Sequence, residues 1–389
     1  MPLLPTPDIT APCPHATICG GCDFQDVLYS RQTAYKEAVL RELFTGLVPE
    51  NAWRPFLATT DPQPFYYRNK IRYGFVEVGE KILPSRHAKG ETDADIPMRV
   101  CLLQSDLSVE IAHATAEFAT KAGWKVFSTT EPTGFLKHIL IREGKRTGEF
   151  MVSLVTTEKA PDLSEWARSV QSLSPQIKSI YQTKTWGRNN EHQEDHLLAG
   201  ESKIREKIGE YEFVISPHAF FQTNSLMVEK LYNLVRDSAR LQPTDCLWDL
   251  YAGSATIGMY LSKDCKRVIS IENNLQNIAD AEENIALNDV KNLEVFSGSV
   301  DQIVNSQFIN AHTADGIVVD PPRAGLSPYL RRLLPHIPHR RLVYVSCNPQ
   351  TLKRDLEDLT RSGYKVGEIR GVDMFPHTLH CEMVVVFEK

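Results

Sequence analysis

The sequence predicts an α/β protein built from two parts, a β-rich α+β domain over residues 57–215 and a doubly wound parallel sheet over residues 216–389. Strand-like runs broken by glycine and proline dominate the first part. In the second part strands alternate with helices, which is typical of a parallel sheet with helices on both faces. A length of 389 residues is enough for two hydrophobic cores.

The region before residue 57 is expected to be accessory to these two domains. Residues 1–12 contain four prolines and are interpreted as a flexible leader. Residues 13–22 hold a cluster of cysteines. Residues 23–56 carry apolar side chains at roughly helical spacing from residue 27 to residue 47, which predicts an amphipathic helix that packs on the second domain.

Periodicity and turn residues predict the elements of both domains. In the β-rich domain the predicted strands are Lys70–Val78, His138–Arg142, Phe150–Val155, Ile177–Gln182 and Tyr211–Ile215, with one helix near 107–122. In the second domain the predicted strands are Cys246–Tyr251, Arg267–Glu272, Leu293–Phe296, Gly316–Asp320, Leu342–Ser346, Val366–Val372 and Met383–Glu388. The predicted helices there are Ala255–Ser262, Gln276–Asn288, Pro328–Leu334 and Gln350–Ser362.

Composition excludes several classes of protein. Hydrophobic residues make up 42% and charged residues 24%, and no apolar run approaches the roughly 18–20 residues of a membrane helix. The first residues lack the basic and apolar regions of a signal peptide, so we expect a cytoplasmic protein without membrane contact. A net charge of −6 argues against non-specific coating of nucleic acid but permits a local basic groove.

A strand, a small-residue turn and a helix start lie at residues 249–258, which read D-L-Y-A-G-S-A-T-I-G. Such a turn lets the backbone approach a ligand, and the helix N-terminus offers free N–H groups. Glu272 ends the next strand, where a carboxylate can accept hydrogen bonds from ribose hydroxyls. The pattern indicates a pocket for a nucleoside cofactor, and a plain strand–helix turn is the alternative.

A carboxylate and a rigid corner follow a later strand, in the run from Asp320 through two prolines to Arg323. This arrangement is typical of methyltransferases that use S-adenosylmethionine (SAM). Enzymes that methylate amino groups place an aromatic residue after the prolines to stack on a base. Arg323 at this place therefore points away from an amine as the methyl acceptor.

Cys347 follows the next strand, where α/β sheets keep their ligands. Carbon 5 of uracil is a poor nucleophile, but addition of a thiolate at carbon 6 makes an enolate that is nucleophilic at carbon 5. Glu382 can then remove the carbon 5 proton, and Arg323 is a candidate donor to the enolate oxygen. The alternatives are a core thiol for Cys347 and a solvated strand-edge side chain for Glu382.

Together these segments resemble the RNA (uracil-C5) methyltransferases, which make 5-methyluridine. The resemblance rests on residues 249–254, 320–325, 345–356 and 372–382, and on I-S-P-H-A-F-F-Q-T-N at 215–224, and it covers nearly the whole chain. It implies a C-terminal Rossmann-like SAM methyltransferase domain with Cys347 as nucleophile and Glu382 as base. The SAM contacts that it implies are Gln222, Tyr251, Thr256, Glu272, Ser299 and Asp320.

A second set of candidate ligands comprises Cys13, Cys19, Cys22 and the remote Cys101. Four thiolates suit an iron–sulfur cluster or zinc, and spacing does not choose between them. The resemblance implies the [4Fe–4S] cluster of the ribosomal-RNA members of the family, with zinc as the alternative, in a structural role. Those members carry an N-terminal RNA-binding barrel, which the short segment before Cys13 predicts to be absent here.

Aromatic and basic residues interleave from Phe65 to Tyr73, so Arg68 and Lys70 are candidate RNA contacts. A strand with a solvated basic face is the alternative. We interpret the protein as a monomeric, SAM-dependent enzyme that methylates a uridine in 23S ribosomal RNA. Transfer RNA remains an alternative substrate. A cytosine-C5 methyltransferase would carry different motifs, and a non-catalytic iron–sulfur RNA-binding or assembly factor would not need Cys347.

Overall fold

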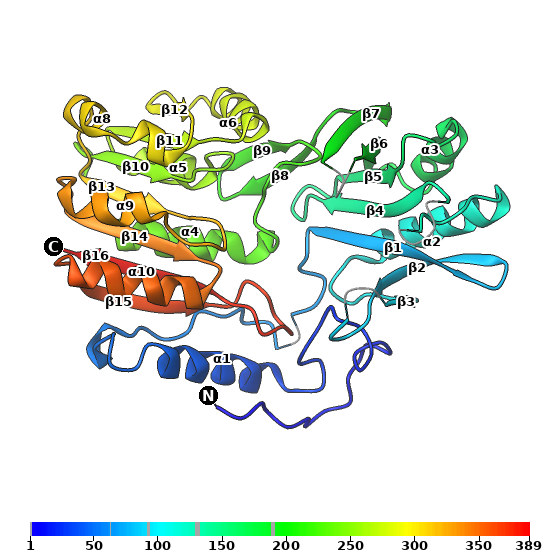
Figure 1. Ribbon diagram of the computed structural model, residues 1–389, viewed down its shortest axis with the longest axis horizontal. Coiled ribbons are helices and arrows are strands. Elements are labelled where there is room, and N and C mark those ends of the chain that lie inside the picture. Colours follow the sequence, from blue (N-terminus) through cyan, green and yellow to red (C-terminus); the bar gives the residue numbers. More distant parts are fainter. Residues whose placement is uncertain (1, 63, 92–93, 129–132, 188–190) are drawn as a thin grey trace.

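The computed structural model describes residues 2–62, 64–91, 94–128, 133–187 and 191–389. Two seven-stranded sheets lie side by side along the longest axis (Figure 1). The sheet of the C-terminal domain is at the left in this view and the sheet of the β-rich domain at the right. Among the described residues, no helix is both long enough and apolar enough to cross a membrane.

The C-terminal sheet has the strand order β12-β11-β10-β13-β14-β16-β15. Its strands are β10 (Cys246–Leu250), β11 (Arg267–Glu272), β12 (Leu293–Ser297), β13 (Gly316–Val319), β14 (Arg341–Ser346), β15 (Lys365–Val372) and β16 (Glu382–Glu388). Neighbours from β12 to β14 pair in parallel, as predicted. β16 inserts antiparallel between β14 and β15, a reversal that the alternation of strands and helices did not reveal.

Helices cover both faces of this sheet, because neighbouring residues of each strand point to opposite sides. Leu247 joins the core under α4 (Ser225–Ala239), α5 (Thr256–Leu261) and α6 (Leu275–Leu287). Trp248 joins the core under α9 (Pro328–Leu333) and α10 (Pro349–Arg361), to which α1 (Tyr29–Leu43) contributes Leu40. The short helices α7 (Val300–Ile303) and α8 (Ser306–Ala311) follow β12. Helix α4 was not predicted, although Asn224 caps it by accepting a hydrogen bond from Met227 N at 3.1 Å.

The β-rich domain has the strand order β3-β2-β1-β4-β5-β6-β7, covered on one face by α2 (Asp106–Lys121) and α3 (Ser164–Gln171). The strands are β1 (Lys70–Val78), β2 (Lys81–His87), β3 (Asp95–Pro97), β4 (Leu136–Glu143), β5 (Phe150–Thr156), β6 (Ile177–Trp186) and β7 (His192–Gly200). A hairpin of β8 (Ile204–Ile208) and β9 (Tyr211–Ile215) follows. The prediction missed β2, β3, β7, β8 and α3. The strand β7 was not predicted because most of its residues are polar and exposed, so apolar and polar residues hardly alternate along it.

The N-terminal segment runs along the C-terminal domain (Figure 1). Within the predicted leader, Asp8 accepts a hydrogen bond from Leu28 N at 2.7 Å and pairs with Arg31 at 2.7 Å. A short 3-10 helix, η1 (Glu50–Ala52), follows α1. Residues 53 and 57 then form parallel bridges with residues 369 and 372 of the edge strand β15. The segment therefore covers an otherwise open edge of the sheet.

Candidate active site

Three side chains from different strand ends meet at one edge of the C-terminal sheet. Asp320 directly follows β13 and Cys347 directly follows β14, its parallel neighbour. β16 begins at Glu382 and runs antiparallel to β14, with Ser346 opposite Met383. The next pair in this register is Cys347 and Glu382. All three side chains line a cavity of about 560 Å³, which we call the catalytic cavity.

The catalytic cavity brings together most of the predicted site residues. Its lining includes Arg68, Gln222, Tyr251, Thr256, Glu272, Asp320, Arg323, Cys347 and Glu382. An adjoining cavity of about 420 Å³ shares Tyr251 and Glu272 with it and also contains Ser299. Lys70 lies outside both linings, half-buried in β1, where burial and then the charge of Arg142 lower its pKa to about 8.

Several lining residues were not predicted as site residues: Phe220, Phe221, Tyr232, Asp249, Asn273 and Phe375. Phe220 and Phe221 immediately precede Gln222, and Asn273 follows Glu272. Their closeness in sequence to predicted site residues is a signal that could have identified them. Tyr232 lies within α4, the helix missed from sequence. Its hydroxyl lies 2.6 Å from Oγ1 of Thr256, which places an unpredicted aromatic side chain against a predicted contact.

The turn after β10 is held in an unusual backbone conformation. Tyr251 and Ala255 both have positive φ, 64° and 55°, a region that costs an L residue about 1–3 kcal/mol. Gly253 N donates to Oε2 of Glu272 at 2.8 Å, and Asn274 N donates to Oε1 at 2.8 Å. Glu272 thus fixes the turn that forms the cavity wall, and each of its oxygens can still accept a further hydrogen bond.

Asp249 lies beneath this turn and is 1% exposed. Its Oδ2 accepts hydrogen bonds from Gly258 N at 3.0 Å and Ser270 Oγ at 3.1 Å, whereas Oδ1 has no partner among the described residues. A Cβ atom at position 258 would lie 2.7 Å from Oδ2, so only glycine permits this contact. Burial raises the pKa of Asp249 to about 7 despite the two hydrogen bonds.

Gln222 connects the catalytic cavity to the β-rich domain. Its Nε2 donates to Oδ2 of Asp320 at 3.4 Å, and its backbone oxygen accepts from Asn69 Nδ2 at 2.7 Å. Asn69 also donates to Ser225 Oγ at 2.7 Å and, through its backbone N, to the oxygen of Thr223 at 2.9 Å. The residue that precedes β1 therefore fixes the loop that carries Gln222.

The thiol and the carboxyl groups of the cavity favour their neutral forms. Burial, followed by the charges of Glu382 and Asp320, raises the pKa of Cys347 to about 11, and Arg323 opposes this shift. Burial and then the charge of Asp320 raise the pKa of Glu382 well above its usual range. Burial and the charge of Asp249 raise the pKa of Asp320 to about 7. The free cavity is thus rich in acids that hold their protons near neutral pH.

The loop that carries Arg323 is tied to the turn after Cys347. Asn348 Nδ2 and Thr351 Oγ1 both donate to the backbone oxygen of Arg323, at 2.9 and 3.1 Å. These hydrogen bonds therefore hold this loop against the turn that follows the thiol.

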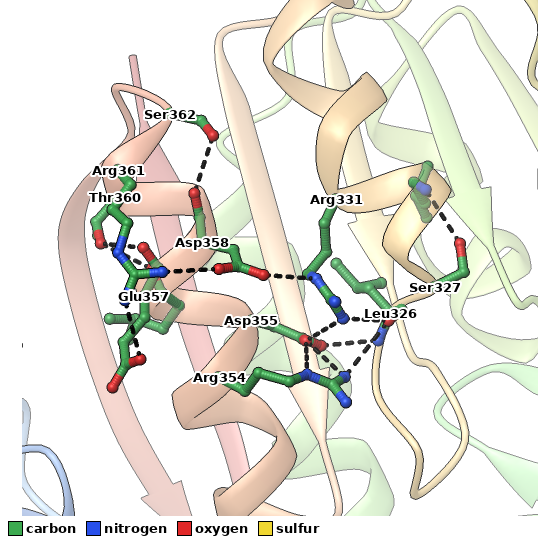
Figure 2. A network of polar contacts seen from close by, with 12 residues as sticks. Leu326, Ser327, Arg331, Arg354, Asp355, Glu357, Asp358, Thr360, Arg361 and Ser362 are labelled. Atoms are coloured by element: carbon green, nitrogen blue, oxygen red, sulfur yellow. Dashed lines mark hydrogen bonds and ion pairs between the residues drawn. The ribbon is translucent and has the colours of Figure 1, made fainter.

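Farther along, the same loop is clamped to α10 by the network in Figure 2. Asp355 accepts from Leu326 N at 2.7 Å, Arg331 Nη1 at 2.9 Å and Arg354 Nη2 at 2.7 Å. Tyr344 of β14 donates to the same carboxylate at 2.8 Å. Arg331 and Arg354 also line the adjoining cavity. The clamp therefore joins the strand before Cys347 and the helix after it to the wall of that cavity.

N-terminal residues hold the loop that leads to Glu382. The backbone oxygen of His377 accepts from Asp23 N at 2.7 Å and Phe24 N at 3.1 Å. Leu379 N donates to Oδ2 of Asp23 at 2.9 Å. Lys36 donates to Oδ1 of Asp373 at 2.7 Å, and both side chains of this ion pair are almost fully buried. The position of the candidate base therefore depends on residues more than 300 positions away in the chain.

The four cysteines predicted as ligands line one small cavity of about 20 Å³, which we call the cysteine cavity. Gly21 N points at Sγ of Cys19 at 3.3 Å, and Gln25 Nε2 points at Sγ of Cys22 at 3.1 Å. Burial raises the pKa of Cys22 to about 12. In the described parts of the chain, no group of three or more His, Cys, Asp or Glu side chains is arranged to hold a metal ion. The cysteines share a cavity without converging on one point.

Arg68 lines both the catalytic cavity and the cysteine cavity. Its Nε is buried and has no hydrogen-bond partner among the described residues. Its backbone N donates to the oxygen of Leu103 at 3.0 Å, two residues after Cys101, and the preceding Tyr67 donates through its hydroxyl to Pro376 O at 3.1 Å. Residues 67–69 thus contact the cysteine cavity, the loop before Glu382 and the loop that carries Gln222.

Comparison with known proteins shows that the chain is similar to RNA methyltransferases. The model of the tRNA (uracil-5-)-methyltransferase family matches residues 145–389. An uncharacterized RNA methyltransferase of Halalkalibacterium halodurans is 33% identical over 391 residues, covering 98% of this chain and 84% of that relative. A similar protein from Clostridium tetani is 33% identical over 385 residues, covering 97% of this chain and 83% of that relative.

Among solved structures, the chain is similar to the tRNA (uracil-54, C5)-methyltransferase of Pyrococcus abyssi in complex with S-adenosyl-L-homocysteine (SAH). The TM-score is 0.76 with 29% sequence identity, over 94% of this chain and 85% of that one. The likeness therefore extends through both domains.

Proposed function

The chain belongs to the RNA (uracil-C5) methyltransferase family, and we propose that it methylates carbon 5 of a specific uridine through a covalent adduct between Cys347 and carbon 6. Its use of SAM follows from the family and from the SAH-bound relative. The observation that carries the covalent mechanism is the meeting of Cys347, Asp320 and Glu382 in one cavity. We assign residues 216–389 to catalysis and residues 57–215 to RNA binding.

In the proposed reaction, the thiolate of Cys347 attacks carbon 6 of a flipped uracil. The electrons of the carbon 5–carbon 6 double bond move toward O4, which makes an enolate with nucleophilic carbon 5. Arg323 lines the cavity and opposes the rise in the pKa of both Cys347 and Glu382, so its positive charge acts at this place. A guanidinium there stabilises both the thiolate and the enolate oxygen.

We assign the methyl-donor site to the two adjoining cavities. The turn at 251–255, the oxygens of Glu272 and the polar group of Gln222 suit the ribose and the amino-acid part of a nucleoside cofactor. Ser299 borders the adjoining cavity and suits the base. SAM supplies an electrophilic methyl group on a positively charged sulfur. The fit is supported by Asp249 and Glu382, whose buried carboxyl groups each keep one oxygen without a partner in the part of the chain that the structure describes.

Glu382 completes the proposed cycle by removing the proton from carbon 5. The carbon–hydrogen electrons re-form the carbon 5–carbon 6 double bond, and Cys347 leaves as a thiolate. Its Oε2 has no hydrogen-bond partner among the residues that the structure describes and is available for this proton. A carboxyl group with a raised pKa is a stronger base than an exposed one, which suits removal of a proton from carbon.

We propose an RNA-binding surface around the mouth of the catalytic cavity, with contacts from Arg323, Arg68 and Lys70. Support is strongest for Arg68, because it lines the cavity and its buried Nε has no hydrogen-bond partner within the described ranges. Lys70 lies two residues along the same chain segment but outside the cavity lining, so its contact would be with a neighbouring phosphate.

The proposed substrate is ribosomal RNA, specifically 23S RNA, because the cysteine set is similar to that of ribosomal-RNA members. Transfer RNA is the second candidate, favoured by the Pyrococcus abyssi relative, which is a tRNA (uracil-54, C5)-methyltransferase. Labelled SAM, the purified protein and separate ribosomal and transfer RNAs lacking 5-methyluridine will distinguish the two. We expect 5-methyluridine in 23S RNA, and label confined to transfer RNA would reassign the substrate.

We further propose that Cys13, Cys19, Cys22 and Cys101 hold a [4Fe–4S] cluster. The shared cavity, the N–H groups directed at two sulfurs and the lining residues Arg68 and Arg86 all suit a negatively charged thiolate set. Zinc needs four sulfurs about 3.8 Å apart, from a zinc–sulfur distance of about 2.3 Å. In a cubic cluster each sulfur binds a different iron, so wider spacing suffices. The cavity is small, so the cysteine-bearing loops would open around the cluster.

RNA that contains 5-fluorouridine tests the covalent mechanism directly. Fluorine cannot be removed as a proton, so methyl transfer should leave a complex between the wild-type protein and RNA that survives denaturation. The complex should require SAM and should be absent from Cys347→Ser. A non-catalytic RNA-binding factor would bind the RNA but form no such complex, and that outcome would falsify the proposal.

A further inference from the structure

The catalytic cavity holds more acidic groups than its cations can pair. Asp320 and Glu382 both line it, and Glu382 is only 2% exposed with no partner for Oε2 among the described residues. The side chain of Asp320 accepts a long hydrogen bond from Nε2 of Gln222, at 3.4 Å. Carboxylates in a buried site with so few donors are costly, so a proton is the simplest partner for this pair.

Charged and titratable groups face the pair from every element around it. These are Asp249 on β10, Glu272 at the end of β11, Cys347 after β14, Tyr232 on α4, and the two arginines Arg68 and Arg323. Glu272 already accepts two backbone hydrogen bonds, and Arg323 faces both the thiol and Glu382. The two arginines are therefore too few to neutralise Asp320 and Glu382 as well as Asp249.

Resting on the proposed function, we propose that Asp320 and Glu382 share one proton in the donor-free enzyme and release it when a positively charged methyl donor occupies the cavity. In the bound state Glu382 is ionised and its Oε2 is free. Once methyl transfer has consumed the positive charge, the pair regains its affinity for a proton. Glu382 then takes the carbon 5 proton, the double bond re-forms, and Cys347 is released as a thiolate.

This arrangement gives Asp320 a role beyond contact with the donor. Burial and neighbouring negative charge raise the pKa of both carboxyl groups. A nearby cation lowers those pKa values, so the base becomes strong only after the positive charge has gone. The same charge lowers the pKa of the Cys347 thiol, which favours attack on uracil only when a methyl group is present.

The direction in which methyl-donor affinity changes with pH follows from these pKa shifts. A ligand that lowers a raised pKa binds more tightly as pH rises through the window between the two values, because its binding then no longer has to expel the proton. SAM carries a positive sulfur and SAH a neutral one, while their amino and carboxylate groups are the same. Titration of those shared groups cancels when the two affinities are compared.

Isothermal titration calorimetry of the purified protein with SAM and with SAH, from about pH 5.5 to 8.5, tests the proposal. We expect the ratio Kd(SAH)/Kd(SAM) to rise by up to about tenfold per pH unit where the pair titrates. Buffers of different ionisation enthalpy should also reveal proton release with SAM and less with SAH. A ratio that is constant with pH would overturn the proposal, since Arg323 alone would then keep the pair ionised.

Two further proteins assign the effect. The double variant Glu382→Gln/Asp320→Asn should flatten the ratio, because no carboxyl group of the pair remains to hold the proton. Cys347→Ala should keep the pH dependence, because the thiol titrates far above the window. A slope that survives in the double variant would assign the proton to another group and refute the pair. Loss of 5-methyluridine formation with the slope intact would refute the proposed function instead, so the two failures are distinguishable.

Discussion

The catalytic cavity and the cysteine cavity share Arg68, yet they are built in different ways. The catalytic cavity lies at the ends of sheet strands, with Asp320, Cys347 and Glu382 placed by β13, β14 and β16. The cysteine cavity lies among loops, and three of its four cysteines fall within ten residues. A sheet fixes its strand ends through many hydrogen bonds, whereas loops need a local crosslink or ligand to hold them.

The two cavities are also connected through the backbone. Asp23, directly after Cys22, accepts from Leu379 N and donates to His377 O on the loop that leads to Glu382. Asn69, directly after Arg68, donates to Gln222 O. Residues next to the cysteine cavity therefore hold two of the loops around the catalytic cavity, the loop before Glu382 and the loop that carries Gln222.

The largest expected effect on activity comes from removing the proposed nucleophile. Cys347→Ala should lower methyl transfer by at least about 10⁴-fold, because no other group can add to carbon 6. Methyl transfer from labelled SAM to RNA provides the measurement. Cys246→Ala is the matched control, since Cys246 is a buried thiol at the opposite end of a strand and should remain active. Equal activity of both variants would show that Cys347 is not the nucleophile and would contradict the proposed mechanism.

The base variant should stop the reaction at a later step. Glu382→Gln should lower turnover by about 10²- to 10⁴-fold, because the carbon 5 proton cannot leave. Unlike Cys347→Ala, it should accumulate a SAM-dependent covalent complex with ordinary uridine RNA, visible on a denaturing gel. Lost turnover without such a complex would mean that Glu382 acts before or during methyl transfer.

A cysteine variant should give an intermediate effect and leave the methyl-donor site intact. Cys22→Ala should lower methylation by about 10²-fold, because the loop before Glu382 loses its support and the base is displaced. It should also abolish the visible absorbance of an iron–sulfur cluster, while SAH affinity changes little. Cys265→Ala, a buried thiol outside both cavities, is the control. Full activity of a cluster-free Cys22→Ala would separate the two cavities functionally.

The smallest expected effect concerns the shared residue. Arg68→Ala should raise the KM for RNA about tenfold and reduce its salt dependence by about one phosphate contact. Arg86→Ala is the matched control, because Arg86 lines the cysteine cavity alone. An unchanged KM in Arg68→Ala, or an equal change in Arg86→Ala, would place the role of Arg68 in the cysteine cavity rather than on RNA.

The sequence by itself determined the candidate site residues, because their motifs are local. The turn at 249–254, the run at 320–323 and the strand before Cys347 each form within a few residues, so period and spacing predict them. The alternation of strands and helices also determined the parallel core of the C-terminal sheet.

Only the tertiary structure decided the features that depend on contacts between distant segments, such as the position of Glu382 and the pKa values of the cavity. The antiparallel insertion of β16 sets Glu382 beside Cys347, and nothing in the local pattern states the direction of a final strand. Burial of Asp320 and Glu382 in one cavity raises their pKa values, although either side chain would titrate normally when exposed. The support of the loop before Glu382 by residues 23–36 likewise arises only on folding, because hydrogen bonds and burial act between neighbours in space rather than in sequence.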